Sequence, residues 1–402
     1  MDDTKTRPVV VVVLVSNLEF GGAQRQLIEL ANHIGCENIQ LHICSLSDYV
    51  PMGTLLDDRD SRLHIVAKRH KYDIGVVPRI ARLLQRLNAD VVHGYLFDAE
   101  IAARLAGRLA GVSAIGNCER NTNYDFKRVQ LLAYFLTRRF VTFYIANSNA
   151  GARFNQASLG NSTDLYFTIH NGVDTERFRP MDPSRARAEL GIGDHHFVVG
   201  MFGSFKEQKN HPLLFRAARH LIERHPDTRI LIVGDELAGG LHGSTDYKRR
   251  VMQLVDDLDI RDYFVFSANS ISVEQLYPAC DVTALPSLFE GTPNVALESM
   301  ACCVPVVASN VSDNAYVIRD GETGFVVDLH DETAFAERLL RLAGDPTLRK
   351  TLGQNARQWM IDEFSCACLA RRTAVVYQHA IGRTSPEADK LRSFQELPAS
   401  PS

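Results

Sequence analysis

Residues 287–301 read SLFEGTPNVALESMA and place two carboxylates, Glu290 and Glu298, eight positions apart. Thr292 is a favourable helix N-cap and Pro293 a favourable first helical residue, because the fixed φ of proline suits that position and its missing N–H would have no partner there. The apolar run just before this stretch is typical of a buried strand. The sequence therefore predicts a strand-to-helix turn that contains Glu290, and ligands bind at such turns in open parallel sheets.

The two carboxylates suit an elongated ligand. The first backbone N–H groups of the predicted helix, with the positive end of its dipole, can anchor hydroxyl or phosphate oxygens. Glu298 lies six residues beyond the expected cap, about 9 Å along the helix axis at ~1.5 Å per residue. One carboxylate could then hold a sugar and the other a ribose. An isolated pair with this spacing is more often two solvated surface residues, so the interpretation depends on the rest of the chain.

Length and composition indicate a globular protein of more than one domain. The chain has 402 residues, 45% apolar and 23% charged, which favours two α/β domains. Its net charge of −4 gives no reason to expect a nucleic-acid partner. The eight cysteines form no C-x2-C pair, which is typical of reduced thiols in the cytosol. The apolar run at 8–15 is shorter than the ~20 residues of a spanning helix and precedes no cleavage signal, so we expect a cytoplasmic protein.

Short apolar runs alternate with amphipathic segments along the chain, which predicts βαβ units and parallel sheets. The strand candidates are residues 9–15, 39–45, 90–95, 114–118, 143–147 and 166–170, then 197–202, 229–233, 264–267, 282–286, 305–308 and 325–327. We interpret the chain as two tandem Rossmann-like domains that face each other across a cleft. The expected divisions are an N-terminal domain at 1–174, a linker at 175–183, a second domain at 184–364, a helix at 365–382 that crosses back to the first domain, and a disordered tail at 383–402.

Two other turns carry residues that suit a phosphate. The strand predicted at 9–15 leads to Gly21 and Gly22 ahead of a helix, and paired glycines let backbone N–H groups approach a phosphate closely. A tight turn without a ligand would use the same residues, and the pattern is not the G-x-G-x-x-G of nicotinamide-binding proteins. In the second domain, Ser204 and Lys209 lie in the corresponding turn, where a lysine could neutralise the diphosphate of a leaving nucleotide.

Together these features resemble a known enzyme family. The tandem domains, Gly21-Gly22-Ala23, the Asn171-Gly172-Val173-Asp174 segment, Lys209 and the 287–301 element are similar to the retaining GT-B glycosyltransferases of family 4, also called glycosyl transferases group 1. The resemblance covers most of residues 9–364. It implies transfer of a hexose from a nucleotide sugar such as a UDP- or GDP-sugar, without a cofactor or a metal ion.

The resemblance also implies roles for single residues. Glu290 would contact the hydroxyls of the donor sugar near the reacting centre, Lys209 would stabilise the departing diphosphate, and Glu298 would bind the ribose. The backbone of the four residues after Glu290 would hold sugar and phosphate oxygens, with help from the paired glycines of the first domain. The members of this set are Gly21, Gly22, Gly291, Thr292, Pro293 and Asn294.

The chain departs from the family pattern at two positions. Ser204 stands where the family commonly has an arginine, so one fixed cation is missing from the expected phosphate site, and Lys206 is a candidate replacement. Many members have His-x-His after the fourth strand, whereas this chain reads His93-Gly94-Tyr95. We keep His93 as a further catalytic candidate, although a lone histidine at a strand end is more often structural.

The acceptor is less directly indicated. Lys127-Arg128 and Arg138-Arg139 bracket the apolar run at 131–136, and arginines recur at helical spacing on residues 79, 82 and 86. Basic residues beside apolar ones could rest on the inner face of a membrane, where lipid-linked or polysaccharide acceptors of cell-surface synthesis are glycosylated. A core-facing helix with a charged outer face would produce the same pattern. A sugar-nucleotide epimerase of GT-B fold and a non-catalytic carbohydrate-binding relative are the alternative functions.

Overall fold

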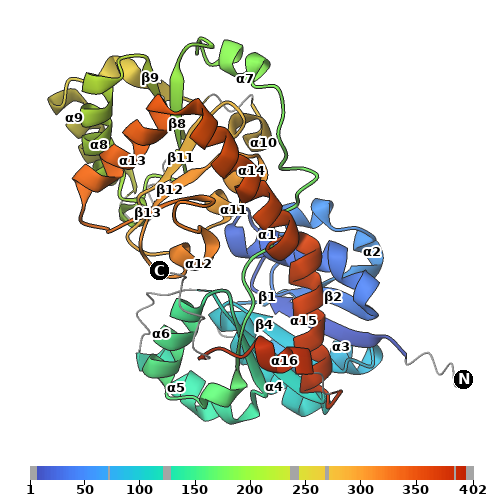
Figure 1. Ribbon diagram of the computed structural model, residues 1–402. Coiled ribbons are helices and arrows are strands. Elements are labelled where there is room, and N and C mark those ends of the chain that lie inside the picture. The colour runs from blue at the N-terminus through green and yellow to red at the C-terminus, as the bar shows by residue number, and fades with distance from the viewer. Residues whose placement is uncertain are drawn as a thin grey trace, which may run out of the picture. The chain divides into compact units, whose positions relative to one another are not determined.

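The computed structural model describes residues 7–70, 73–120, 128–235, 244–267, 271–383 and 386–394 (Figure 1). Its contacts divide the chain into two compact units. Unit 1 comprises Met1–Gly172 together with Cys366–Ser402, and unit 2 comprises Val173–Ser365. Lys127 and the end of the predicted tail, residues 395–402, lie outside the described residues. In the described part of the chain, no helix is both long enough and apolar enough to cross a membrane.

Unit 1 is built on a seven-stranded parallel sheet with the order β3-β2-β1-β4-β5-β6-β7. Its inner strand β1 has the sequence VVVVVLV, and every residue is buried, because helices cover both faces of a parallel sheet and both must then be apolar. The strands are β1 (Val9–Val15), β2 (Ile39–Ser45), β3 (Leu63–Ile65), β4 (Val91–Tyr95), β5 (Ala114–Glu119), β6 (Phe143–Ala146) and β7 (Tyr166–Thr168).

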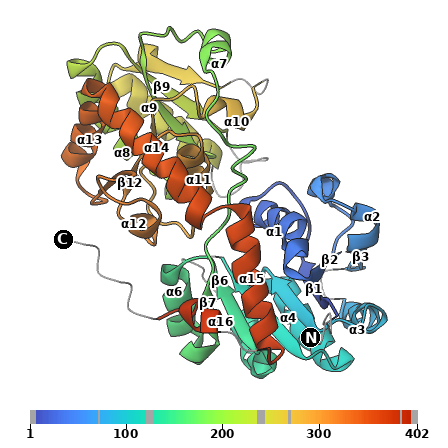
Figure 2. The same cartoon turned by 45° about the vertical axis from the view of Figure 1, so that its right-hand side comes forward.

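The helices of unit 1 come from both ends of the chain. After the long excursion through unit 2, the chain returns as α15, which packs against α1, and Figure 2 shows α15 and α16 beside the strands of this unit. The helices are α1 (Gly22–His33), α2 (Arg59–Arg62), α3 (Val76–Arg86), α4 (Phe97–Ala110), α5 (Arg128–Thr137), α6 (Asn149–Leu159), α15 (Cys366–Ala380) and α16 (Pro386–Lys390).

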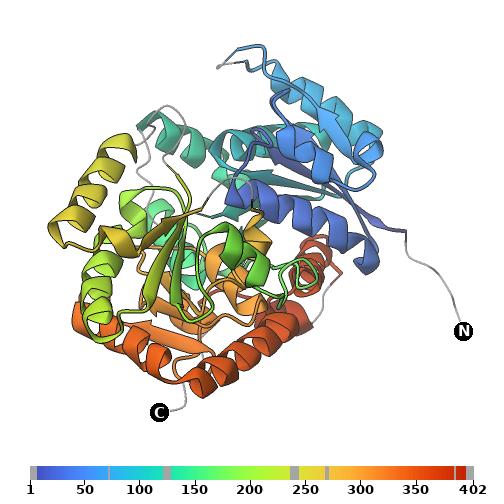
Figure 3. The ribbon, with the colours of Figure 1, turned by 90° about the horizontal axis from the view of Figure 1, so that it is seen from above.

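Unit 2 repeats the design with a six-stranded parallel sheet of order β10-β9-β8-β11-β12-β13. The strands are β8 (Phe197–Phe202), β9 (Thr228–Val233), β10 (Phe264–Phe266), β11 (Val282–Leu285), β12 (Val306–Ser309) and β13 (Gly324–Val327). The larger helices α8, α9, α13 and α14 form an arc around these strands in Figure 3. The helices are α7 (Ser184–Glu189), α8 (His211–Arg224), α9 (Ser244–Asp257), α10 (Val273–Leu276), α11 (Asn294–Ala301), α12 (Asn314–Val317), α13 (Glu332–Gly344) and α14 (Pro346–Glu363).

The start of α11 differs from the prediction. Pro293 has ψ at 103°, an extended value, so it is the N-cap, and the first helical residue is Asn294. Thr292 is therefore not the cap, and Glu298 lies four residues into the helix, about 6 Å along its axis. Proline fixes φ but leaves ψ open, and the extended ψ delays the helix by one residue.

The predicted tail and linker also differ from the structure. Residues 386–394 are ordered, because α16 and the segment after it lie against β7, the edge strand of the unit 1 sheet. The N–H of Thr168 donates to the carbonyl of Leu391 at 2.8 Å, and the N–H of Ser393 donates to the carbonyl of Tyr166 at 2.9 Å. Composition predicted disorder there, but these edge hydrogen bonds fix the chain. In the segment expected to be a linker, Phe178 is buried at 3% exposure in the core of unit 2.

Candidate functional site

The strongest candidate site lies in unit 2, where the turns after β8 and β11 meet. These strands are neighbours in the sheet, so their following turns emerge side by side. The ammonium of Lys209, in the turn after β8, lies 2.7 Å from Oε1 of Glu290, in the turn after β11. The side chains are only 16% and 9% exposed, respectively. The structure thus joins two of the predicted residues, 81 positions apart, in a largely buried ion pair.

Further hydrogen bonds hold Glu290 in place. The hydroxyl of Ser287 donates to the same carboxylate oxygen at 2.7 Å, and the N–H of Glu290 donates to the hydroxyl of Ser312 at 3.2 Å. Gln208 joins the two turns, because its side-chain amide donates to the carbonyl of Phe289 at 3.0 Å and its own carbonyl accepts from Leu288 at 2.8 Å. The carboxylate is therefore fixed from several sides. Gln208 and Ser312 carry no motif that the sequence alone could single out.

A second lysine adds positive charge to this site. Lys206 is half-buried, and burial together with the charge of Lys209 lowers its pKa, while Glu290 acts in the opposite direction. The charge of Lys206 thus interacts with the charges of both Lys209 and Glu290. Ser204 lies two residues earlier and is partly exposed. Lys206 therefore supplies a cation close to where the family arginine is missing.

Two glycines let the turn after β8 and the turn after β9 approach each other. Gly203 follows β8 with φ at 141°, and Gly234 follows β9 with φ at 133°, values that side chains rarely allow. A Cβ on Gly234 would lie 2.3 Å from the carbonyl oxygen of Gly203, and a Cβ on Gly203 would lie 3.2 Å from the side chain of Lys209. Gly203 therefore leaves room for the side chain of Lys209, and Gly234 leaves room for the backbone of Gly203. Gly234 was not among the predicted site residues.

The second carboxylate, Glu298, lies on α11 and is anchored by a buried tyrosine. The hydroxyl of Tyr277 donates to Oε2 of Glu298 at 2.8 Å. Burial, reinforced by the charge of Glu298, raises the pKa of Tyr277 well above its usual value, so the phenol keeps its proton. Its ring stacks on Phe202 with centroids 4.0 Å apart. Glu298 remains partly exposed, as a ligand-binding carboxylate must be.

The predicted residues around the start of α11 are distributed between surface and interior. Gly291 and Asn294 are partly exposed, whereas Thr292 and Pro293 are buried. No side-chain hydrogen bond caps the helix, and the N–H of Ala296 donates to the carbonyl of Pro293 at 3.0 Å. The positive end of the helix dipole at this turn favours anionic oxygens.

The predicted residues of unit 1 fall in two different environments. Gly21 is the N-cap of α1 with extended φ and ψ, and Gly22 is exposed at its first position. No side chain caps this helix either. His93 is fully buried at 0% exposure, and its Nδ1 lies 2.8 Å from the hydroxyl of Tyr377. Burial lowers its pKa to about 3, so the imidazole is neutral and packs as an aromatic core residue.

A search among known proteins identifies the family. Residues 20–177 match the model of Glycosyltransferase Family 4, and residues 183–359 match that of Glycosyl transferases group 1. A D-inositol 3-phosphate glycosyltransferase of Acidothermus cellulolyticus is 36% identical over 331 residues, 80% of this chain and 68% of that protein. An Escherichia coli UDP-Gal:alpha-D-GlcNAc-diphosphoundecaprenol alpha-1,3-galactosyltransferase is 27% identical over 73% of this chain and 76% of its own.

Solved structures agree on the fold. Anabaena Alr3699/HepE in complex with UDP superposes with a TM-score of 0.80 at 22% identity, over 92% of this chain and 100% of that one. A sucrose-phosphate synthase of Thermosynechococcus elongatus gives 0.74 at 18% identity, over 92% and 98%. The two parallel-sheet units therefore have the GT-B fold. The chain belongs to glycosyltransferase family 4, which confirms the resemblance seen in its sequence. It spans about half the length of several other curated relatives, such as 52% of the enzyme from Streptomyces bingchenggensis.

Proposed function

We propose that this chain is a retaining glycosyltransferase that moves a hexose from a nucleotide sugar to a lipid-linked or polysaccharide acceptor in the synthesis of a bacterial cell-surface glycan. The observation that carries the proposal is the largely buried Lys209–Glu290 pair, which joins the turn after β8 to the turn between β11 and α11. It sets a cation suited to a diphosphate beside a carboxylate suited to sugar hydroxyls. The names of the relatives, several of which act on sugar or inositol phosphates, support the same class of reaction.

The proposed chemistry uses charge stabilisation. When the bond between the anomeric carbon and the diphosphate oxygen breaks, negative charge grows on the diphosphate. Lys209, assisted by Lys206 and the first N–H groups of α11, would neutralise that charge. Glu290 would orient the sugar through its hydroxyls, and Glu298 would hold the ribose. We propose that this step needs no metal ion, so a chelator should leave the initial rate unchanged.

Donor binding is tested first. A panel of UDP-, GDP- and ADP-sugars should raise the unfolding temperature for the true donor alone, because a ligand stabilises the folded state by mass action. The uridine nucleotide is our first choice, since the structural neighbour Alr3699/HepE was solved with UDP and with UDP-glucose. No stabilisation by any member of the panel would contradict a donor site.

Transfer is tested with variants of the pair. With a synthetic polyprenyl diphosphate-linked sugar as acceptor, Glu290→Gln and Lys209→Met should each reduce kcat by about 10²–10³-fold, the usual cost of losing one electrostatic contact to the transition state. Glu207→Gln is the matched control, because Glu207 lies in the same turn as Lys209 and is 73% exposed beside Arg250. Full activity in Glu290→Gln would refute the assignment. The anomeric configuration of the product, read by NMR, tests retention.

The alternative functions give different outcomes in the same assay. A sugar-nucleotide epimerase would convert the donor without any acceptor, and a non-catalytic relative would bind the donor without consuming it. The non-catalytic alternative is retained because Ser204 stands where the family commonly has an arginine. Release of nucleoside diphosphate that depends on acceptor would exclude both.

Arg120 in unit 1 supports an acceptor that carries phosphate. Its guanidinium contacts the thiol of Cys118 at 3.0 Å, the side-chain oxygen of Asn171 at 2.9 Å and the hydroxyl of Tyr95 at 3.3 Å. In the described part of the chain, Arg120 makes no ion pair with a carboxylate. A cation held by neutral groups at the carboxyl end of β5 suits a phosphate. Arg120→Gln should raise KM for a diphosphate-linked acceptor far more than for an uncharged sugar.

A membrane contact is the second part of the acceptor proposal. Helix α5 exposes Val129, Leu132 and Leu136 at 78%, 60% and 64%, with Arg128 and Arg139 at its ends also exposed. An apolar helix face flanked by arginines suits an anionic membrane surface at the cytoplasmic side. All eight cysteines are free thiols, in keeping with a reducing compartment.

Flotation with anionic vesicles tests this contact. Leu132→Ser with Leu136→Ser should abolish flotation. Leu109→Ser on α4 is the control, because Leu109 is similarly exposed at 59% but lies on another helix. The membrane contact would be refuted by a wild-type protein that does not float, or that floats equally with neutral and anionic vesicles.

A further inference from the structure

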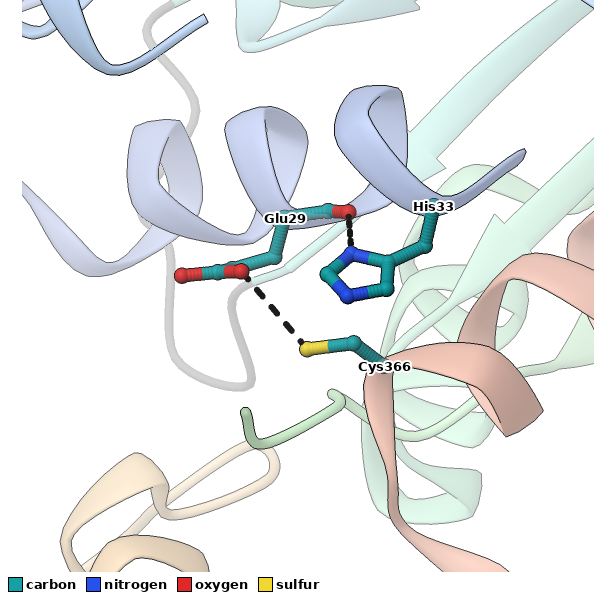
Figure 4. Close-up of side chains that lie close together, drawn as sticks. All are labelled: Glu29, His33 and Cys366. Carbon is teal, nitrogen blue, oxygen red and sulfur yellow. Dashed lines mark hydrogen bonds between the residues drawn. The ribbon is translucent and has the colours of Figure 1, made fainter. Parts of the chain in front are cut away.

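Three metal-ligating side chains meet in unit 1, at the C-terminal half of α1 and the start of α15. Glu29 and His33 lie on α1, and Cys366 is the first residue of α15 (Figure 4). One ligand atom of each lies within 4.8 Å of the other two. They belong to the same unit, and the residues of the Lys209–Glu290 pair belong to the other. The cluster is therefore a separate feature with chemistry of its own.

The histidine is already arranged as a metal ligand would be. Its Nδ1 lies 2.8 Å from the backbone carbonyl oxygen of Glu29. A carbonyl only accepts, so Nδ1 carries the proton, and the neutral ring offers the lone pair of Nε2 as the ligand atom. Histidines that bind metals usually donate their other ring N–H to such an acceptor, which fixes the tautomer and the ring. Glu29 and His33 are four residues apart on one helix, so both point to the same side.

The cysteine completes the set at a suitable distance. Its Sγ lies 3.7 Å from a carboxylate oxygen of Glu29. Around a tetrahedral zinc ion, with Zn–S about 2.3 Å and Zn–O about 2.0–2.2 Å, a sulfur and an oxygen ligand are about 3.6 Å apart. Two ligands need hardly move to accept the ion. Cys366 is 2% exposed, whereas Glu29 and His33 are partly exposed, so a water molecule can provide a fourth ligand.

We propose that Glu29, His33 and Cys366 form a zinc site that fastens α15 to α1. Zinc would bind the Glu29 carboxylate, Nε2 of His33, the Cys366 thiolate and one water, and the thiol proton would be released to solvent. Thiolate and imidazole select zinc over magnesium or calcium, which prefer oxygen ligands. Cys366 is the residue at which the chain re-enters unit 1, so the ion would hold the returning segment at its first helical turn. This role is structural and independent of sugar transfer.

Metal titration of the full, untagged chain tests the proposal. After removal of metals with a chelator, wild type should bind one zinc ion per chain in isothermal titration calorimetry and release one proton. Zinc at 100-fold over Kd should raise the unfolding midpoint of unit 1 by roughly 5–10 °C. Cobalt(II) in place of zinc should give a thiolate-to-metal charge-transfer band, and magnesium should have no effect.

Variants identify the ligands. Cys366→Ser should lose the charge-transfer band and weaken zinc binding at least 100-fold, and Glu29→Gln and His33→Gln should weaken it at least 10-fold. Cys368→Ser is the matched control, because Cys368 is also a buried cysteine on α15 but lies outside the cluster. Circular dichroism checks that each variant folds. Absence of the cobalt band in wild type, or equal binding by Cys366→Ser and Cys368→Ser, would show that the thiol only hydrogen-bonds Glu29.

Discussion

Removing both partners of the Lys209–Glu290 pair should destabilise unit 2 by less than the sum of the two single removals. The groups are 2.7 Å apart with side chains 16% and 9% exposed, so either charge left alone remains largely buried. Breaking a buried pair from one side costs about 3–5 kcal/mol. We expect Lys209→Met to cost about 3 kcal/mol, near the lower limit because Ser287 still donates to the carboxylate. Glu290→Gln should cost about 2 kcal/mol, because the lysine can extend to solvent.

The double variant should recover part of this loss. Lys209→Met with Glu290→Gln leaves no buried charge, so we expect a total cost of about 2 kcal/mol instead of the additive 5 kcal/mol. The coupling energy is then about 3 kcal/mol, at the upper end for groups in direct contact. In a unit of this size, each kcal/mol corresponds to roughly 2–4 °C in Tm. Lys209→Met should therefore unfold about 6–12 °C below wild type.

The chain contains its own probe for this measurement. Its single tryptophan, Trp359, lies on α14 in unit 2, with its indole N–H donating to the carbonyl of Val317 at 3.1 Å. Tryptophan fluorescence during urea unfolding therefore follows unit 2 and not unit 1. Single-variant losses that add in the double variant, with coupling below about 0.5 kcal/mol, would refute a buried, interacting pair.

Other perturbations test the interior of each unit. Burial raises the pKa of Glu119 to about 7 and also raises that of the neighbouring Glu100, so the stability of unit 1 should fall as pH rises from about 4.5 to 7. Glu119→Gln should weaken this dependence in urea titrations at pH 5 and 7.5, and an unchanged dependence would contradict the assignment to Glu119. His93→Gln should lower the free energy of unfolding by about 1–3 kcal/mol, because the contact with Tyr377 is lost. The pH–rate profile between pH 6 and 8 should stay unchanged, because the pKa of His93 is about 3. A shifted profile would instead indicate that His93 is catalytic. Gly234→Ala should lower the free energy of unfolding by several kcal/mol and weaken donor binding in calorimetry. Gly321→Ala is the control and should cost only about 1 kcal/mol, because Gly321 has φ at 74° but nothing lies within 4 Å of an added Cβ. Equal losses in the two variants would contradict the steric argument.

Most elements could be located from local pattern. Continuous apolar runs gave the predicted strands at 9–15 and 197–202, and the structure has β1 and β8 with the same bounds. Helices α13 and α14 each begin after an aspartate whose side chain accepts from the backbone N–H three residues on, a local signal of a helix start. Strand β3 was missed because it has three residues, two partly buried and one exposed, too few for a period to emerge.

The sequence by itself determined the family and located the candidate site at a strand-to-helix turn, because a carboxylate, glycine and proline around such a turn are local features. Only the tertiary structure decided which residues act together. Lys209 meets Glu290 because β8 and β11 are neighbours in the sheet, and no pattern along the chain states that pairing. Contacts between distant residues likewise hold the segment at 386–394 and bring Glu29 to Cys366. Sequence records local preference, whereas strand order and helix packing arise from burying the whole apolar surface at once.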